Sequence, residues 1–258
     1  MSILELENTG RFLRSRKAFT LVEMITVVGL ITIVLTIVLP TISSVTDSTD
    51  RSKTANLLPP YVALARTEAL KRSEYVGLHI GLSDRGSGIR CYMAFVSGQF
   101  NGSQIAIQAL KNSGAVAYPP KALPSPYAFG ELSGNFVDGS GNFTSVSSGD
   151  SDGDGIQDAL EDFTTFTILF SPIGTMVAKE PITYIADSTL FGTPAPSNDI
   201  LWKLPQNDHD TTTTSVLGVT LVDCQILGDK TGSDWASYLN DNAEFMAFNS
   251  YTGEYFSD

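Results

Sequence analysis

The stretch Arg16-Lys17-Ala18-Phe19-Thr20-Leu21-Val22-Glu23 decides the fold, because it joins a basic segment to an apolar run that continues to Leu39. A helix needs roughly 20 apolar residues to cross a membrane. We therefore expect a membrane-spanning helix over residues 19–39. The positive residues before it predict a cytoplasmic N-terminus and an exported C-terminal domain. A secretory signal peptide is the rival interpretation, but no small-residue cleavage site follows the run.

Glu23 is the single charged residue of this run. An ionisable side chain in an apolar span is costly and points to a function. The alternative is an ordinary membrane anchor whose glutamate reaches the interface without a further role.

The segment from Ala18 to Glu23 resembles the leader junction of type IV pilins and type II secretion pseudopilins. The resemblance implies that a prepilin peptidase cleaves between Ala18 and Phe19 and that Phe19 is N-methylated. It also implies that Glu23 receives the new terminal amine of a neighbouring subunit during assembly. Ala18 departs from the family, which usually has glycine before the cut.

Three further segments are similar to H-type minor pseudopilins: residues 65–72, 169–174 and 247–254. The insertion at about 99–161 and the Pro59–Pro60 pair depart from that pattern. The implied fold is α+β and pilin-like, with a long N-terminal membrane-spanning helix packed on an antiparallel β-sheet. The implied partners are other pilin or pseudopilin subunits, prepilin peptidase, the inner membrane and secreted cargo.

The expected organisation follows from these segments. Residues 45–72 have the apolar spacing of an amphipathic helix, which the prolines should kink or break. Short helices are expected over 104–111 and 235–240, and strands over 75–80, 89–96, 163–170, 175–178, 182–186, 216–227 and 245–248. The domains are a leader (1–18), a transmembrane and assembly helix (19–39), the soluble part of that helix (40–73, broken at 59–60) and a β-rich extracytoplasmic domain (74–258).

The chain of 258 residues is acidic, with a net charge of -12. Because the leader is basic overall, the remainder is more acidic still. Such a charge opposes binding to a phosphate backbone, so no nucleic-acid partner is expected.

A second motif runs from Asp150 to Glu161 and fits a twelve-residue calcium loop. At the ligand positions of such a loop stand Asp150, Asp152, Asp154, Ile156 (through its carbonyl), Asp158 and Glu161. Several carboxylates without a cation would repel one another, so we expect one structural calcium ion. The alternative is a solvated acidic loop.

The two cysteines, Cys91 and Cys224, fall in predicted strands, and both a disulfide and two buried free thiols remain open. His79 and His209 are too few and too far apart for a zinc site. No nucleophile–base arrangement or phosphate-binding loop is present in the sequence, so we do not expect an enzyme.

The function that this sequence favours is a non-enzymatic minor pseudopilin-like subunit of a secretion pseudopilus or pilus-like filament. Its expected location is the bacterial inner membrane as a single-pass protein, or a periplasmic or surface filament. The alternative is a surface minor pilin that acts as an adhesion module.

Overall fold

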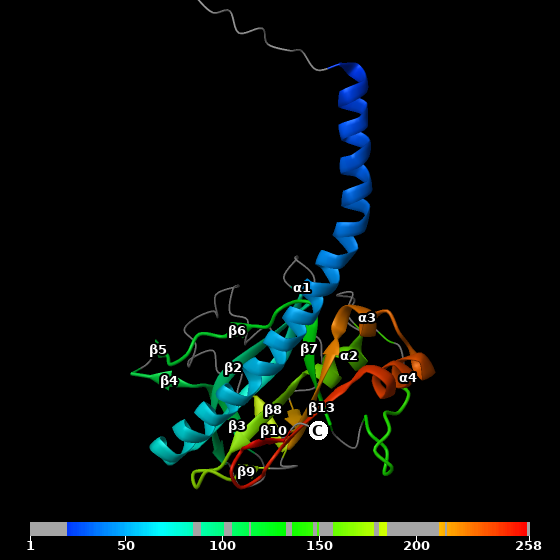
Figure 1. The fold of residues 1–258 in the computed structure, drawn as a ribbon. Coiled ribbons are helices and arrows are strands. Elements are labelled where there is room, and N and C mark those ends of the chain that lie inside the picture. The colour runs from blue at the N-terminus through cyan, green and yellow to red at the C-terminus, as the bar shows by residue number, and fades with distance from the viewer. Residues whose placement is uncertain are drawn as a thin grey trace, which may run out of the picture. The chain divides into compact units, whose positions relative to one another are not determined.

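The computed structural model describes residues 20–84, 89–100, 105–113, 115–132, 136–146, 149, 157–177, 181–184, 212–214 and 216–256. They form an α+β fold (Figure 1). Contacts divide the chain into two compact units, Met1–Asp47 and Ser48–Asp258. In chain order the elements are α1 (Leu21–Arg72), β1 (Tyr75–Asp84), β2 (Ile89–Phe100), β3 (Ile105–Ala109), β4 (Lys111–Asn112), β5 (Ala115–Val116), β6 (Lys121–Ala122), β7 (Tyr127–Glu131), α2 (Asp158–Thr164), β8 (Phe166–Phe170), β9 (Met176–Val177), β10 (Pro181–Tyr184), β11 (Thr212–Thr214), β12 (Gly218–Asp223), α3 (Cys224–Gly228), α4 (Gly232–Asn242), β13 (Glu244–Phe248) and β14 (Tyr255–Phe256).

The predicted membrane-spanning helix over residues 19–39 is wrong. Within the described ranges, no helix combines the length and the apolar character that crossing a membrane requires. The transmembrane, single-pass and inner-membrane assignments are corrected with it.

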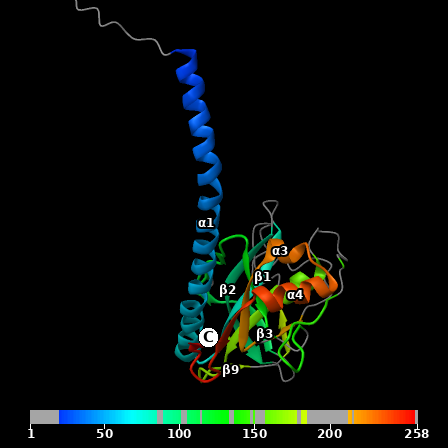
Figure 2. The ribbon, with the colours of Figure 1, turned by 45° about the vertical axis from the view of Figure 1, so that its right-hand side comes forward.

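The part of α1 that belongs to the second unit is amphipathic, as predicted for residues 45–72. Leu58, Val62, Ala65 and Ala69 are completely buried, and their spacing of four, three and four residues places them on one face. This face joins the main hydrophobic core. In Figure 2 this part of α1 lies on one side of the strands, and α3 and α4 lie on the other.

Helix α1 continues through Pro59 and Pro60, where we expected a kink or a break. Neither proline has an N–H, so the carbonyls of Ala55 and Asn56 lose their usual i+4 hydrogen bonds. A proline inside a helix costs about 3 kcal/mol. Burial of Leu58 and of the apolar residues after it, at roughly 1.5–3 kcal/mol for each large side chain, offsets that cost.

The larger sheet has the strand order β11-β10-β3-β2-β1-β8-β9, with β6 also paired to β2. It starts from the β1–β2 hairpin, which pairs from Tyr75↔Gly98 to Asp84↔Ile89. All five residues of β8 are buried, as in a strand covered on both faces. The pairs of this sheet are antiparallel except β10–β3, which is parallel.

The smaller sheet has the order β14-β13-β12-β7. The ring of Phe163, from α2, lies in the core against three other aromatic rings, Phe136, Phe143 and Trp235. Its centroid is 5.1 Å from that of Phe136 and 5.7 Å from that of Trp235, both in edge-to-face contact. Gly130 of β7 leaves room for it, because a Cβ there would lie 2.1 Å from Phe163 Cε1. The core thus depends on a glycine within a strand.

Hydrogen bonds among charged side chains connect the last turn of α1 to β4. The carboxylate of Glu68, only 4% exposed, accepts hydrogen bonds from Arg72 Nε at 2.7 Å and Lys71 Nζ at 3.1 Å. Tyr118 Oη also donates to it at 3.3 Å. Arg72 Nη1 donates to the carbonyl of Lys111, at 3.1 Å. A nearly buried carboxylate is therefore compensated by several donors.

Several predicted elements are confirmed and others are wrong. The strands expected over 75–80, 89–96 and 245–248 are present, and so is the helix over 235–240. The helix expected over 104–111 is the strand β3, because pairing with β2 buries Ile105 and Ile107 on alternate positions. The strands expected over 163–170 and 216–227 are shorter, since α2 occupies the start of the first and α3 the end of the second.

Candidate functional site

Glu23 takes part in a capping box at the start of α1. Thr20 donates to Glu23 Oε2 from its backbone N–H at 2.8 Å and from its hydroxyl at 2.9 Å. In return the N–H of Glu23 donates to Thr20 Oγ1 at 3.2 Å. This reciprocal pair satisfies backbone donors that a helix start leaves open. The backbone and then the hydroxyl hydrogen bond from Thr20 hold the pKa of Glu23 below its usual value.

The other predicted processing and assembly residues, Ala18 and Phe19, lie outside the described residues. The capping box gives Glu23 a local role that requires no second subunit. It does not remove the negative charge, which stays at the exposed start of the helix.

The first part of α1 presents apolar side chains on every side. From Leu21 to Thr36 each residue is exposed in the single chain, with Leu21 76% and Ile25 64% exposed. The threonines make this surface less polar than the sequence implies. The hydroxyl of Thr26 donates to the carbonyl of Val22 at 2.8 Å, and Thr32 and Thr36 make the same i−4 contact. Such internal bonding turns these hydroxyls away from a partner.

Two of the six predicted calcium ligands lie in the part of the chain that the structure describes. Asp150, Asp152, Asp154 and Ile156 lie outside the described residues, whereas Asp158 and Glu161 lie in the first turn of α2. Residues three apart on a helix share a face. The N–H of Asp158 donates to the carbonyl of Gly149 at 2.8 Å, so these two residues lie side by side. In the part of the chain that the structure describes, no group of three or more potential metal ligands is present.

Cys91 and Cys224 are buried free thiols. Cys91 lies in β2, and Cys224 begins α3 and donates from Sγ to the carbonyl of Pro126 at 2.7 Å. Burial raises the pKa of each thiol to about 12. They form no disulfide in this structure.

His79 is buried in β1, and its Nδ1 lies 3.2 Å from Thr167 Oγ1 on β8. Burial lowers the pKa of this imidazole to about 4, so at neutral pH the ring is uncharged. His209 falls outside the described residues.

Two features escaped sequence reasoning. The Glu68–Arg72 contact has the i,i+4 spacing of a helix ion pair, so the sequence carried a signal for it. No such signal joins Lys53 of α1 to Lys121 of β6, which line one groove.

Comparison with protein-family models, curated proteins and solved structures gives no match to this chain.

Proposed function

We propose that this protein is a non-enzymatic structural subunit of a pilin-like filament, of the minor-pseudopilin type, and that its copies or related subunits associate through the first part of α1. One observation carries the proposal: this helix is apolar all round and exposed over Leu21–Leu35. A helix with this character is normally buried, and large exposed apolar patches mark interaction sites.

Subunit association is favoured by the amount of apolar surface available. Burial of one large aliphatic side chain contributes roughly 1.5–3 kcal/mol to the free energy of association. This helix exposes many such side chains, among them Leu30, Ile31 and Ile33. The resemblance of residues 18–23 to the pilin leader junction supports the same function.

Cysteine cross-linking tests the association. Val28, 58% exposed on the apolar helix, is replaced in Val28→Cys, and the full-length protein is treated with a mild oxidant. We expect disulfide-linked dimers on a non-reducing gel. The natural thiols do not interfere, because both are buried and have a raised pKa.

The matched control is Ser233→Cys, an exposed position in α4. It has a thiol in the second unit and should give few dimers. Equal cross-linking of both variants, or none in Val28→Cys, contradicts association through α1.

Processing needs a separate measurement. If a prepilin peptidase acts on the chain, N-terminal sequencing of the mature protein should begin at a methylated Phe19. A terminus at Met1 in cells that hold an active prepilin peptidase would overturn the processing part of the proposal. Cross-linking through α1 does not depend on that result.

We further propose that residues 150–161 bind one structural calcium ion, on the strength of the ligand spacing in the sequence. The placement of Asp158 and Glu161 in the first turn of α2 is compatible with a loop that ends in a helix. Calcium would bring together carboxylates that otherwise repel one another.

Thermal unfolding tests the calcium site. Extracellular calcium modules have a Kd on the order of 0.1–1 mM, so about 10 mM calcium should stabilise the native state by roughly 1.4–2.7 kcal/mol. Asp152→Ala should abolish the rise in melting temperature. Asp241→Ala, which removes an exposed carboxylate at the end of α4, should keep it. No calcium effect on the wild-type protein excludes the site.

A further inference from the structure

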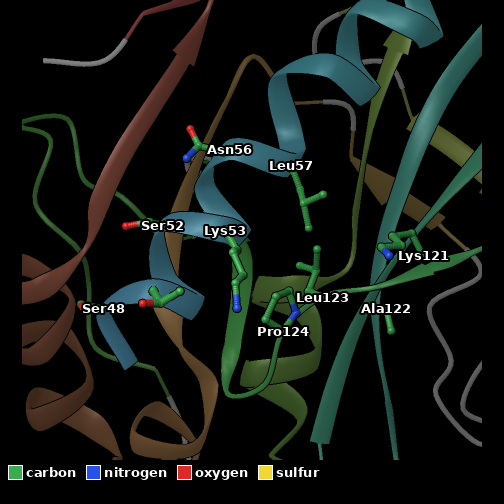
Figure 3. A pocket seen from close by; sticks show the side chains of 10 residues that line it. Ser48, Ser52, Lys53, Asn56, Leu57, Lys121, Ala122, Leu123 and Pro124 are labelled. Atoms are coloured by element: carbon green, nitrogen blue, oxygen red, sulfur yellow. The ribbon is translucent and has the colours of Figure 1, made fainter. Parts of the chain in front are cut away.

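A groove in the second unit lies between α1 and the segment that contains β6. Its volume is about 870 Å³, within the range of roughly 300–1,000 Å³ typical of ligand sites. One wall is the helix surface from Ser48 to Leu57, and the other is residues 121–124. Figure 3 shows Leu57 and Leu123 facing each other across the groove. The groove therefore has an apolar side chain on each of its two walls.

The groove walls carry positive charge. Lys53 projects from α1 towards Pro124, and Lys121 lies on the opposite wall (Figure 3). None of the ten lining residues is acidic. Asp50 lies beside the groove and contacts Lys53, with 2.8 Å from its Oδ1 to Nζ. The site is thus locally basic on a chain whose net charge is -12.

The wall made by β6 offers backbone hydrogen-bonding groups. Leu123 N–H donates to the carbonyl of Cys91 at 2.9 Å, and Ala122 is opposite Tyr92 in the antiparallel pair with β2. Since alternate residues of such a pair direct their N–H and C=O away from the partner strand, those of Ala122 point away from β2. Ala122 also lines the groove.

The helix wall also contains a residue whose backbone carbonyl lacks its usual helical donor. Asn56 lines the groove, and its carbonyl lacks the usual i+4 donor because residue 60 is proline. The groove thus presents backbone hydrogen-bonding groups, two lysines and two leucines. A ligand that matches these groups has N–H donors, C=O acceptors, carboxylates and some apolar surface.

We propose that this groove binds an extended acidic peptide segment of a partner protein. The peptide would lie along the edge of β6, as in strand addition, with its carboxylates towards Lys53 and Lys121 and its apolar side chains towards Leu57 and Leu123. The helix wall from Ser48 to Leu57 is about 14 Å long at 1.5 Å per residue. This length accommodates about four residues of extended peptide. The proposal is independent of association through the apolar part of α1.

Peptide binding to the full-length protein tests the assignment. The probe is a fluorescent hexapeptide of alternating Glu and Val, compared with the same peptide carrying Gln in place of Glu. Fluorescence anisotropy should show binding of the Glu peptide and at least about tenfold weaker binding of the Gln peptide. Binding of the Glu peptide should weaken as salt rises from about 50 to about 500 mM.

Two variants separate the charges from the strand edge. The double variant Lys53→Gln/Lys121→Gln should lose about tenfold in affinity. Lys111→Gln/Lys230→Gln removes two positive charges from residues that do not line the groove and should bind as the wild type does. Ala122→Pro keeps both lysines but lacks the N–H, and it should bind roughly fivefold more weakly. Equal melting temperatures establish that each variant is folded.

Three results would overturn the proposal. The first is equal affinity for the Glu and Gln peptides, and the second is unchanged binding by the lysine double variant. The third is an oligonucleotide of matched charge that binds as tightly as the peptide and is unaffected by Ala122→Pro, since that pattern describes a general anion site.

Discussion

The buried imidazole of His79 should make the protein less stable in acid. Its pKa is about 4 in the folded chain, against 6.5 for an exposed histidine, because burial disfavours the charged ring. The unfolded chain therefore takes up a proton at a higher pH than the native chain does. Stability is at its full value above about pH 6.5 and is lost as the pH falls, until the loss levels off below about pH 4.

The size of this loss follows from the two pKa values. At roughly 1.4 kcal/mol for each pH unit, the difference amounts to about 3 kcal/mol. That is a large share of the stability of a typical domain, about 5–15 kcal/mol. Protonation of this histidine alone should therefore lower the stability of the native state measurably in acid.

Urea denaturation at about pH 7.5, pH 5.5 and pH 4 measures the effect, on the wild type and on His79→Gln. Glutamine keeps a polar side chain near Thr167 but does not titrate in this range. Glu68 and Asp138, whose hydrogen bonds hold their carboxyl pKa values low, weaken both proteins in acid. Their contribution cancels in the comparison.

The free energy of unfolding of the wild type should therefore fall by about 3 kcal/mol more than that of His79→Gln between neutral pH and pH 4. Parallel pH profiles for the two proteins, or a wild type that gains stability relative to the variant in acid, would refute the reasoning.

Other predictions concern the core of the second unit. Glu68→Ala leaves its donors without their buried carboxylate and should cost about 3 kcal/mol in urea denaturation; a cost below about 1 kcal/mol contradicts the network. Gly130→Ala places a Cβ against Phe163 and should lower stability by about 2 kcal/mol, measured by thermal melting; an unchanged melting temperature would show that the ring moves freely. At about pH 8 neither Cys91 nor Cys224 should react with a thiol reagent in the native protein, and both should react in denaturant. If neither cysteine reacts with the reagent in denaturant, the two cysteines form a disulfide instead.

The parts of the fold that the sequence predicts are those with local signals. The alternation of residues 75–80 and 89–96 identifies the β1–β2 hairpin. Gly174 and Gly253, which fall in two of the segments that resemble minor pseudopilins, have positive φ values of 79° and 66°, as tight turns require. Each of these features depends on neighbours a few residues away.

The remaining features depend on distant partners or on a choice between two physical roles. Residues 105–109 carry alanine and glutamine, which suit a helix, but pairing with β2 decides in favour of a strand. The Thr20-x-x-Glu23 spacing matches a capping box as well as a membrane glutamate, and only the geometry distinguishes them. The groove joins Lys53 and Lys121 through tertiary folding alone.

The pairing of β7 with β12 has a consequence for synthesis of the protein. Residues 127–131 find their partners only at 219–223, so β7 leaves the ribosome long before the strand that covers its edge. Closing so long a loop is slow compared with forming the β1–β2 hairpin. Until then β7, buried at four of its five positions in the finished fold, offers an unpaired strand edge to other nascent chains. Chains that stop before β12 should therefore aggregate, and a chaperone that shields this edge should raise the yield of native protein.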